Sequence, residues 1–133
     1  MPALVADTHA VVWYLLESPR LSRIALARMQ QAVAAGDPIL VPTVSIVELI
    51  YLTDKGWVTP VAQERFYRRL DDPEADLRVV PLDRAVAEAV ARIPRNQVPD
   101  MPDRIIAATA LHLGVPLVTR DGRIRASGIE TIW

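Results

Sequence analysis

The chain has 133 residues, of which 51% are hydrophobic and 23% are charged, and 15 Lys and Arg against 16 Asp and Glu give a net charge of −1. This size and composition predict one globular domain over residues 1–133 and exclude a disordered chain. Apolar runs such as 10–16 are far shorter than a membrane span, and no charged leader precedes an apolar stretch. We therefore expect a cytoplasmic protein with no membrane association.

Short apolar runs alternate with helical segments along the chain. The expected strands cover residues 3–6, 39–41, 77–82, 116–119 and 130–133. The expected helices cover residues 8–16, 22–36, 43–54, 59–70, 83–93 and 102–112, and a loop or short helix follows residue 119. This alternation predicts an α/β fold with three α/β/α layers, in which helices cover both faces of a mostly parallel sheet of four to five strands.

Four acidic residues occupy positions that such a sheet makes informative. Asp7 directly follows the first strand and Asp121 lies just beyond the fourth, so both belong to the carboxyl edge of the sheet, where ligands bind. Glu48 lies in the apolar run 44–52, and Asp103 lies in the first turn of an apolar helix. We therefore expect the four acids to converge from separate segments.

Each acid also has a simpler structural interpretation. Asp7 and Asp103 have positions typical of helix caps, and Asp121 precedes Gly122 as turn residues often do. Glu48 needs a partner, because an unpaired carboxylate on an apolar face is costly and no Lys or Arg lies three or four residues away. The candidates are a distant arginine or a cation.

Clustered carboxylates repel one another unless they are protonated, paired with arginine or bound to a metal. The chain has no cysteine, so a metal must be bound by oxygen or histidine. An oxygen-only site favours Mg²⁺ or Mn²⁺, which can activate water and stabilise the charge that develops on a phosphodiester. The chemistry predicted from the acids is thus metal-dependent hydrolysis.

The segments that contain these acids resemble motifs of PIN-domain ribonucleases, especially the VapC toxins of prokaryotic toxin–antitoxin pairs. The similar segments are Leu-Val-Ala-Asp7-Thr-His-Ala, Val44-Ser-Ile-Val-Glu48-Leu, Asp100-Met-Pro-Asp103-Arg-Ile-Ile and Leu117-Val-Thr119-Arg-Asp121. They occur in the family's order over the length of the chain. The resemblance implies a PIN-like fold, a Mg²⁺ or Mn²⁺ site, and hydrolysis of RNA phosphodiesters by the toxin of a type II toxin–antitoxin system. It also implies a homodimer and a cognate antitoxin whose C-terminal segment lies near the acids.

The resemblance also implies roles for single residues. The catalytic and metal-binding quartet is Asp7, Glu48, Asp103 and Asp121. Thr119 is similar to the hydroxyl residue that supports the last acid, and we group it with the substrate-binding candidates Arg104 and Arg120. Asp100 is either a further acid of the site or the N-cap of the helix that follows.

Several neighbouring residues remain open. Arg123 and Arg125 either bind the RNA backbone or lie on a solvated surface, and Thr8 either orients Asp7 or is structural. We expect His9 to have a packing or surface role, and Trp13 and Tyr14 either stack bases or belong to the core. From the acids and the apolar segment 10–16 we expect an antitoxin tail to pack near Trp13 and Leu16 and to direct an arginine or lysine at the acids.

Three other functions compete with this interpretation. A phospho-acceptor signalling domain needs a late lysine, whereas the only lysine is Lys55. A phosphohydrolase that attacks with Asp7 usually has a second aspartate two residues later, where this chain has His9. A catalytically silent PIN-like binding module would not need all four acids, and all four are present.

Overall fold

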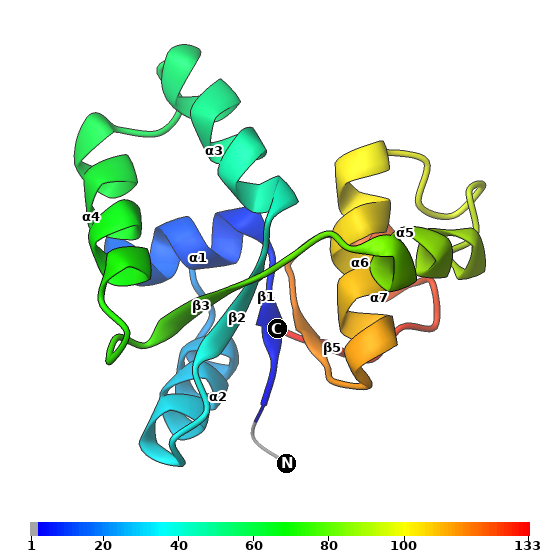
Figure 1. Ribbon diagram of the computed structural model, residues 1–133, viewed down its shortest axis with the longest axis horizontal. Helices are drawn as coiled ribbons and strands as arrows, with labels where there is room; N and C mark the ends of the chain where they lie inside the picture. The colour runs from blue at the N-terminus through cyan, green and yellow to red at the C-terminus, as the bar shows by residue number, and fades with distance from the viewer. Residues whose placement is uncertain (1–2) are drawn as a thin grey trace.

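A computed structural model describes residues 3–133 and contains a sheet of five parallel strands. Residues 1–2 of the expected domain lie outside the described residues. The strands are β1 (Val5–Ala6), β2 (Ile39–Pro42), β3 (Leu77–Val80), β4 (Leu117–Val118) and β5 (Thr131–Ile132). Their order across the sheet is β3-β2-β1-β4-β5, and every pairing is parallel (Figure 1). The described sheet is therefore fully parallel, where the sequence predicted a mostly parallel one.

Helices cover both faces of the sheet, which confirms the predicted three-layer α/β/α fold (Figure 1). The helical segments are α1 (Thr8–Leu15), α2 (Arg23–Ala34), α3 (Val44–Asp54), α4 (Pro60–Asp71), α5 (Arg84–Ala89), the 3₁₀ turn η1 (Val90–Arg92), α6 (Met101–Leu113) and α7 (Gly122–Arg125). Apolar residues of α1 to α4 pack on one face, and those of α5, α6 and α7 pack on the other. Successive side chains of a strand point to opposite faces of the sheet and so contribute to both hydrophobic cores. Ala6 packs in the core under α1 to α4, and Val5 packs in the core under α5 to α7.

The register of the central strands determines which residues meet at the carboxyl edge. Val5 pairs with Leu117 and Ala6 with Val118, so β1 and β4 end side by side. The Asp7 amide then donates to the carbonyl of Val118 over 3.0 Å. The residues that follow β1 and β4 therefore lie close together, as the sequence predicted.

Two predicted boundaries are wrong for reasons connected with proline. The helix expected over 83–93 is α5 followed by η1, because Ile93 precedes Pro94 and adopts an extended conformation (φ −93°, ψ 117°). The strand expected to reach residue 82 ends at Val80, where its partner β2 ends at Pro42. In residues 3–133 no helix is long and apolar enough to cross a membrane.

Candidate active site

A cleft of about 620 Å³ opens at the carboxyl edge of the sheet, and we call it the acid cleft. All four predicted acids line it. Its lining residues are Asp7, Thr8, His9, Trp13, Arg20, Glu48, Asp100, Asp103, Ile106, Arg120 and Asp121. The acids come from the start of α1, the middle of α3, the first turn of α6 and the start of α7. The fold thus brings together carboxylates that are up to 114 positions apart, from residue 7 to residue 121.

Asp7 and Asp121 are helix caps as well as cleft residues. Asp7 Oδ1 accepts a hydrogen bond from the Ala10 amide over 2.9 Å. Asp121 Oδ1 accepts from the amides of Arg123 and Ile124 at 2.8 and 3.2 Å. The capping interpretation is therefore correct for Asp7, whereas Asp121, expected as a turn residue, caps α7, and Asp103 does not cap α6, whose N-cap is Asp100. The two caps hold the carboxylates of Asp7 and Asp121 in fixed orientations at the cleft.

Thr119 lies between these two acids and is fully buried. Its Oγ1 accepts a hydrogen bond from the Asp121 amide over 3.0 Å. Burial raises the pKa of Asp7, and the hydrogen bond with the Thr119 side chain is the largest effect that opposes this rise. A buried hydroxyl cannot contact RNA, so the grouping of Thr119 with the substrate-binding residues is corrected: Thr119 positions the acids.

Among residues 3–133, Glu48 has a hydroxyl partner and no cationic one. The Thr8 hydroxyl donates to Glu48 Oε1 over 2.7 Å, and the Ser45 hydroxyl lies 2.9 Å from Thr8 Oγ1. Thr8 therefore orients Glu48, whereas the sequence suggested Asp7. Burial raises the pKa of Glu48, the bond from Thr8 opposes the rise, and the negative charge of Asp100 adds to it.

Asp100 and Asp103 form one turn at the start of α6. Asp100 Oδ2 accepts a hydrogen bond from the Asp103 amide over 3.1 Å, which makes Asp100 the N-cap, and Asp100 also lines the acid cleft. The two alternatives for Asp100 are therefore compatible. Burial, followed by the negative charges of Asp100 and Asp121, raises the pKa of Asp103 to about 7.

The negative charge of the acid cleft is unbalanced. Among residues 3–133, none of the four acids forms an ion pair with Arg or Lys. The same residues include no group of three or more acidic or histidine side chains already arranged to hold an ion. Magnesium commonly retains several waters and uses one or two carboxylates, so this oxygen-only donor set fits a partly hydrated divalent cation. Asp7, Glu48, Asp103 and Asp121 are the residues that would hold it.

The arginines predicted to bind RNA separate into two groups. Arg104 Nη2 donates to the carbonyls of Val90 and Ile93 at 3.1 and 3.0 Å, so this side chain supports the end of η1. Arg104 is not among the residues that line the acid cleft, unlike Arg120, which is exposed there. The position of Arg104 does not suit a phosphate contact, and its grouping with the substrate-binding residues is corrected.

One cleft residue was missed by sequence analysis. Arg20 lies in the loop between α1 and α2 and lines the acid cleft. No local motif marks it, since its proximity to the acids depends on how the loop returns toward the sheet edge. Arg123 and Arg125 lie in α7 and do not line the acid cleft.

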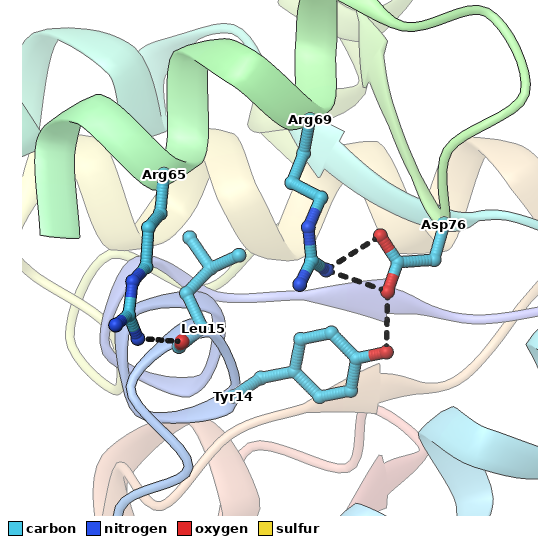
Figure 2. Close-up of polar contacts among 5 residues, drawn as sticks. All are labelled: Tyr14, Leu15, Arg65, Arg69 and Asp76. Atoms are coloured by element: carbon cyan, nitrogen blue, oxygen red, sulfur yellow. Dashed lines mark hydrogen bonds and ion pairs between the residues drawn. The ribbon is translucent and has the colours of Figure 1, made fainter.

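Tyr14 and Trp13 have different environments although they are neighbours in α1. The Tyr14 hydroxyl donates to Asp76 Oδ2 over 2.6 Å, and Arg69 Nη1 lies 2.8 Å from both oxygens of Asp76 (Figure 2). Burial and the bond to Asp76 raise the pKa of Tyr14 to about 12. Tyr14 is therefore part of a structural network between α1, α4 and the segment before β3, which leaves Trp13 as the aromatic side chain at the acid cleft.

A second cleft of about 600 Å³ lies among α1, α2 and α4, and we call it the helical cleft. It is lined by Trp13, Tyr14, Leu15, Glu17, Ser18, Leu21, Leu26, Gln30, Arg65, Arg68 and Arg69. Trp13 lines both clefts and forms part of the wall between them. Leu16, near which we expect a partner to pack, is partly buried against the core and is not among the side chains that line either cleft, whereas Leu26 is the exposed leucine of the helical cleft.

A parallel α/β sheet with unbalanced carboxylates at its carboxyl edge defines a protein with an acidic site suited to a divalent cation. The chain belongs to the PIN domain family, whose model matches residues 4–129. It is 28% identical over 136 aligned positions to Ribonuclease VapC22 of Mycobacterium tuberculosis, and the match covers 95% of this chain and 92% of that protein.

Solved structures show the same fold. VapBC2 from Rickettsia felis, bound to a DNA fragment from its promoter, matches with a TM-score of 0.71 at 15% identity, covering 97% of this chain and 96% of the other. A toxin–antitoxin complex from Klebsiella pneumoniae matches with a TM-score of 0.67 at 20% identity, covering 98% and 97%. The resemblance to the PIN family is thereby confirmed.

Proposed function

We propose that this protein is a Mg²⁺- or Mn²⁺-dependent endoribonuclease that acts in the cytoplasm as the toxin of a type II toxin–antitoxin system, with residues 1–133 forming one nuclease domain. The observation that carries the proposal is the convergence of four carboxylates, with no arginine or lysine paired to them among the described residues, at the carboxyl edge of a PIN fold. The likeness to a protein named a ribonuclease and to toxin–antitoxin complexes supports it.

The chain's own residues supply the site's geometry. A divalent cation held by Asp7, Glu48, Asp103 and Asp121 would supply activation of water and stabilisation of phosphodiester charge. The Ala10 amide and Thr119 orient Asp7, and Thr8 orients Glu48. Burial is the largest cause of the raised pKa values of Asp7, Glu48 and Asp103, and the negative charges of neighbouring acids add to each rise, so a bound cation would relieve this repulsion.

The test is RNA cleavage by the purified protein in Mg²⁺, in Mn²⁺ and in EDTA, with Asp103→Asn as the matched control. We expect divalent-dependent cleavage that the substitution removes. Equal cleavage by both proteins, or cleavage that persists in EDTA, would overturn the assignment of the quartet. No cleavage of any RNA by the wild type would leave a binding module or another phosphohydrolase as the better description.

We also propose that the cognate antitoxin inhibits by occupying the helical cleft and reaching the acid cleft past Trp13. The helical cleft offers the exposed side chain of Leu26 beside the half-buried Trp13, and the acid cleft offers unbalanced negative charge. A segment with apolar anchors followed by an arginine or lysine is complementary to both. A short gene beside the toxin gene that encodes such a segment is the expected source.

A homodimer completes the proposed assembly. Large apolar side chains are exposed along one side of α3 and around the turn into α4. They are Val47, Ile50, Tyr51, Trp57 and Val61. We propose that a second copy covers this surface, since exposed apolar patches of this kind mark interfaces. Light scattering should give a dimer for the wild type and a monomer for Tyr51→Glu, whereas a dimer for both would place the interface elsewhere.

A further inference from the structure

The lining of the acid cleft combines two kinds of side chain. Besides the carboxylates it includes His9, Trp13, Arg20 and Arg120, which are aromatic or cationic. An RNA strand needs both kinds of surface: a place for the phosphodiester that is cut, and a place for the neighbouring base and phosphate. The aromatic and cationic residues therefore suit a part of the substrate that the four acids do not account for.

Arg120 and Trp13 lie next to each other in the lining of the cleft. The Arg120 guanidinium lies over the Trp13 ring with 5.8 Å between its carbon and the ring centroid. The His9 and Trp13 rings are 5.7 Å apart, and the Trp133 ring supports Trp13 from another side at 5.8 Å. We call His9, Trp13 and Arg120 the aromatic–arginine wall. Trp13 is half-buried whereas His9 and Arg120 are exposed, so the wall has a rigid base and an accessible outer surface.

Arg120 makes no ion pair within residues 3–133, although it shares the cleft with carboxylates. An arginine that neutralised the acids would be paired with one of them. Placed 5.8 Å over the centroid of the Trp13 ring, the guanidinium instead presents a flat, charged group to the cleft, and proteins use arginine planes to stack unpaired bases. The His9 ring offers a second surface of the same kind beside it.

We infer that the aromatic–arginine wall stacks an unpaired base adjacent to the phosphodiester that is cut, while Arg20 contacts the RNA backbone. This inference rests on the proposed endoribonuclease function. A base within a duplex is already stacked and paired, so the wall selects RNA that is single-stranded or looped at the cleavage point. Stacking accepts any base, so the selection concerns structure more than sequence.

The test combines a protein change with a substrate change. The cut position is first mapped on a single-stranded oligoribonucleotide, and each flanking nucleotide is then replaced in turn by an abasic one. For the wild type we expect one flanking abasic position to lower kcat/KM by about 5- to 150-fold, the factor that corresponds to loss of one base–aromatic stack. The double variant His9→Ala, Arg120→Ala should cut intact RNA more slowly by a similar factor and should be insensitive to the abasic position.

This combined design separates stacking from a structural role. A variant that merely distorts the cleft loses activity on all substrates. The abasic substitution then lowers kcat/KM of that variant by the same factor as in the wild type. Such additivity, or unchanged kcat/KM for the double variant on intact RNA, would overturn the inference. Arg78→Ala, an exposed arginine on the edge strand β3, is the matched control and should respond to abasic RNA as the wild type does.

A further variant tests the role of Trp13 itself. Trp13→Phe keeps a ring under Arg120 and should retain most of the abasic sensitivity, and Trp13→Leu should lose it while remaining folded by circular dichroism. Failure of the proposed function is distinct from failure of this inference. In the first case the wild type cuts no RNA, and in the second it cuts RNA but the wall variants respond to abasic positions as it does.

Discussion

The acid cleft and the helical cleft share Trp13 and have similar volumes, about 620 and 600 Å³. They differ in whether their charged side chains form ion pairs. In the helical cleft, Arg69 pairs with Asp76, which also accepts from Tyr14, and Arg65 donates to the carbonyl of Leu15 over 3.1 Å (Figure 2). In the acid cleft, Asp7, Glu48 and Asp121 accept hydrogen bonds from amide or hydroxyl groups, and within residues 3–133 none of them pairs with Arg or Lys. Paired charges join elements of the fold, whereas unpaired charges are a cost that a ligand can relieve.

The largest expected effect concerns Asp7. Asp7→Asn removes one charge at constant volume, and we expect RNA cleavage to fall by at least about 100-fold, the scale on which loss of one preorganised electrostatic group slows an enzyme. Metal-free stability should hold or rise, because burial already disfavours the charged form. Cleavage kinetics and thermal melting measure the two effects. Loss of stability with normal cleavage would make Asp7 a cap alone.

The helical cleft is expected to give the next largest effect, on partner binding. Truncating a central aromatic anchor commonly costs about 2 kcal/mol or more, so Trp13→Ala should weaken antitoxin binding about 30-fold. Leu26→Ala should weaken it less. Titration calorimetry with the co-purified partner measures both. Unchanged affinity for both variants, with the fold verified, would place the partner elsewhere, and Leu16→Ala is the control because that side chain is not among those that line either cleft.

The effect of a metal on thermal stability should depend on the residues of the acid cleft and not on those of the helical cleft. A divalent cation that binds only the folded state stabilises it by about 2.7 kcal/mol at 100 times its Kd. We expect millimolar Mn²⁺ to raise the Tm of the wild type and to leave Asp7→Asn, Asp103→Asn almost unchanged. Tyr14→Phe, in the helical cleft, should respond like the wild type. A flat response of the wild type would contradict a metal site.

The pH dependence of metal-free stability follows from Asp103. Its pKa is about 7 in the folded protein and 3.8 is its ordinary value, so between these values the folded state binds more protons than the unfolded state. This contribution to stability is present below pH 3.8 and is lost as the pH rises toward 7. In EDTA we expect the wild type to lose a few degrees of Tm between pH 5 and pH 8 relative to Asp103→Asn. Identical profiles would show that Asp103 does not titrate in this range.

The smallest effect is expected for Tyr14→Phe. The substitution removes the hydrogen bond to Asp76 and leaves the Arg69–Asp76 ion pair in place. We expect a cost of about 0.5 to 1.5 kcal/mol and unchanged RNA cleavage. Urea unfolding and cleavage kinetics measure the two quantities. A drop in cleavage would mean that the helical network also determines the geometry of the acid cleft.

Sequence patterns predicted the positions of the acids because those positions depend on local features. A carboxylate directly after a buried strand, as at Asp7, reaches the sheet edge in any parallel fold. An acid on the apolar face of a helix, as at Glu48, indicates a binding partner, because an unpaired buried carboxylate is costly. The identity of that partner, Thr8, depends on how α1 packs on α3, which no local pattern specifies.

The sequence-based errors concern long side chains and buried hydroxyls. Arg104 is adjacent to an acid in sequence, but its guanidinium extends along α6 to the carbonyls at the end of η1. Thr119 is next to the cleft but its hydroxyl is buried between Asp7 and Asp121, and Arg20 reaches the cleft from a loop without any motif. The direction and length over which a side chain extends depend on tertiary packing, so the spacing of residues in the sequence did not predict them.

The order of the strands has a consequence for when the carboxylate site can form. β1 directly precedes Asp7 and is held between β2 and β4, and β4 precedes Asp121. A chain still emerging from the ribosome that lacks residues 117–121 has an open edge beside β1, no Thr119 to orient Asp7 and no Asp121. The site can therefore assemble only after the segment that contains β4 and Asp121 has been made and has paired with β1.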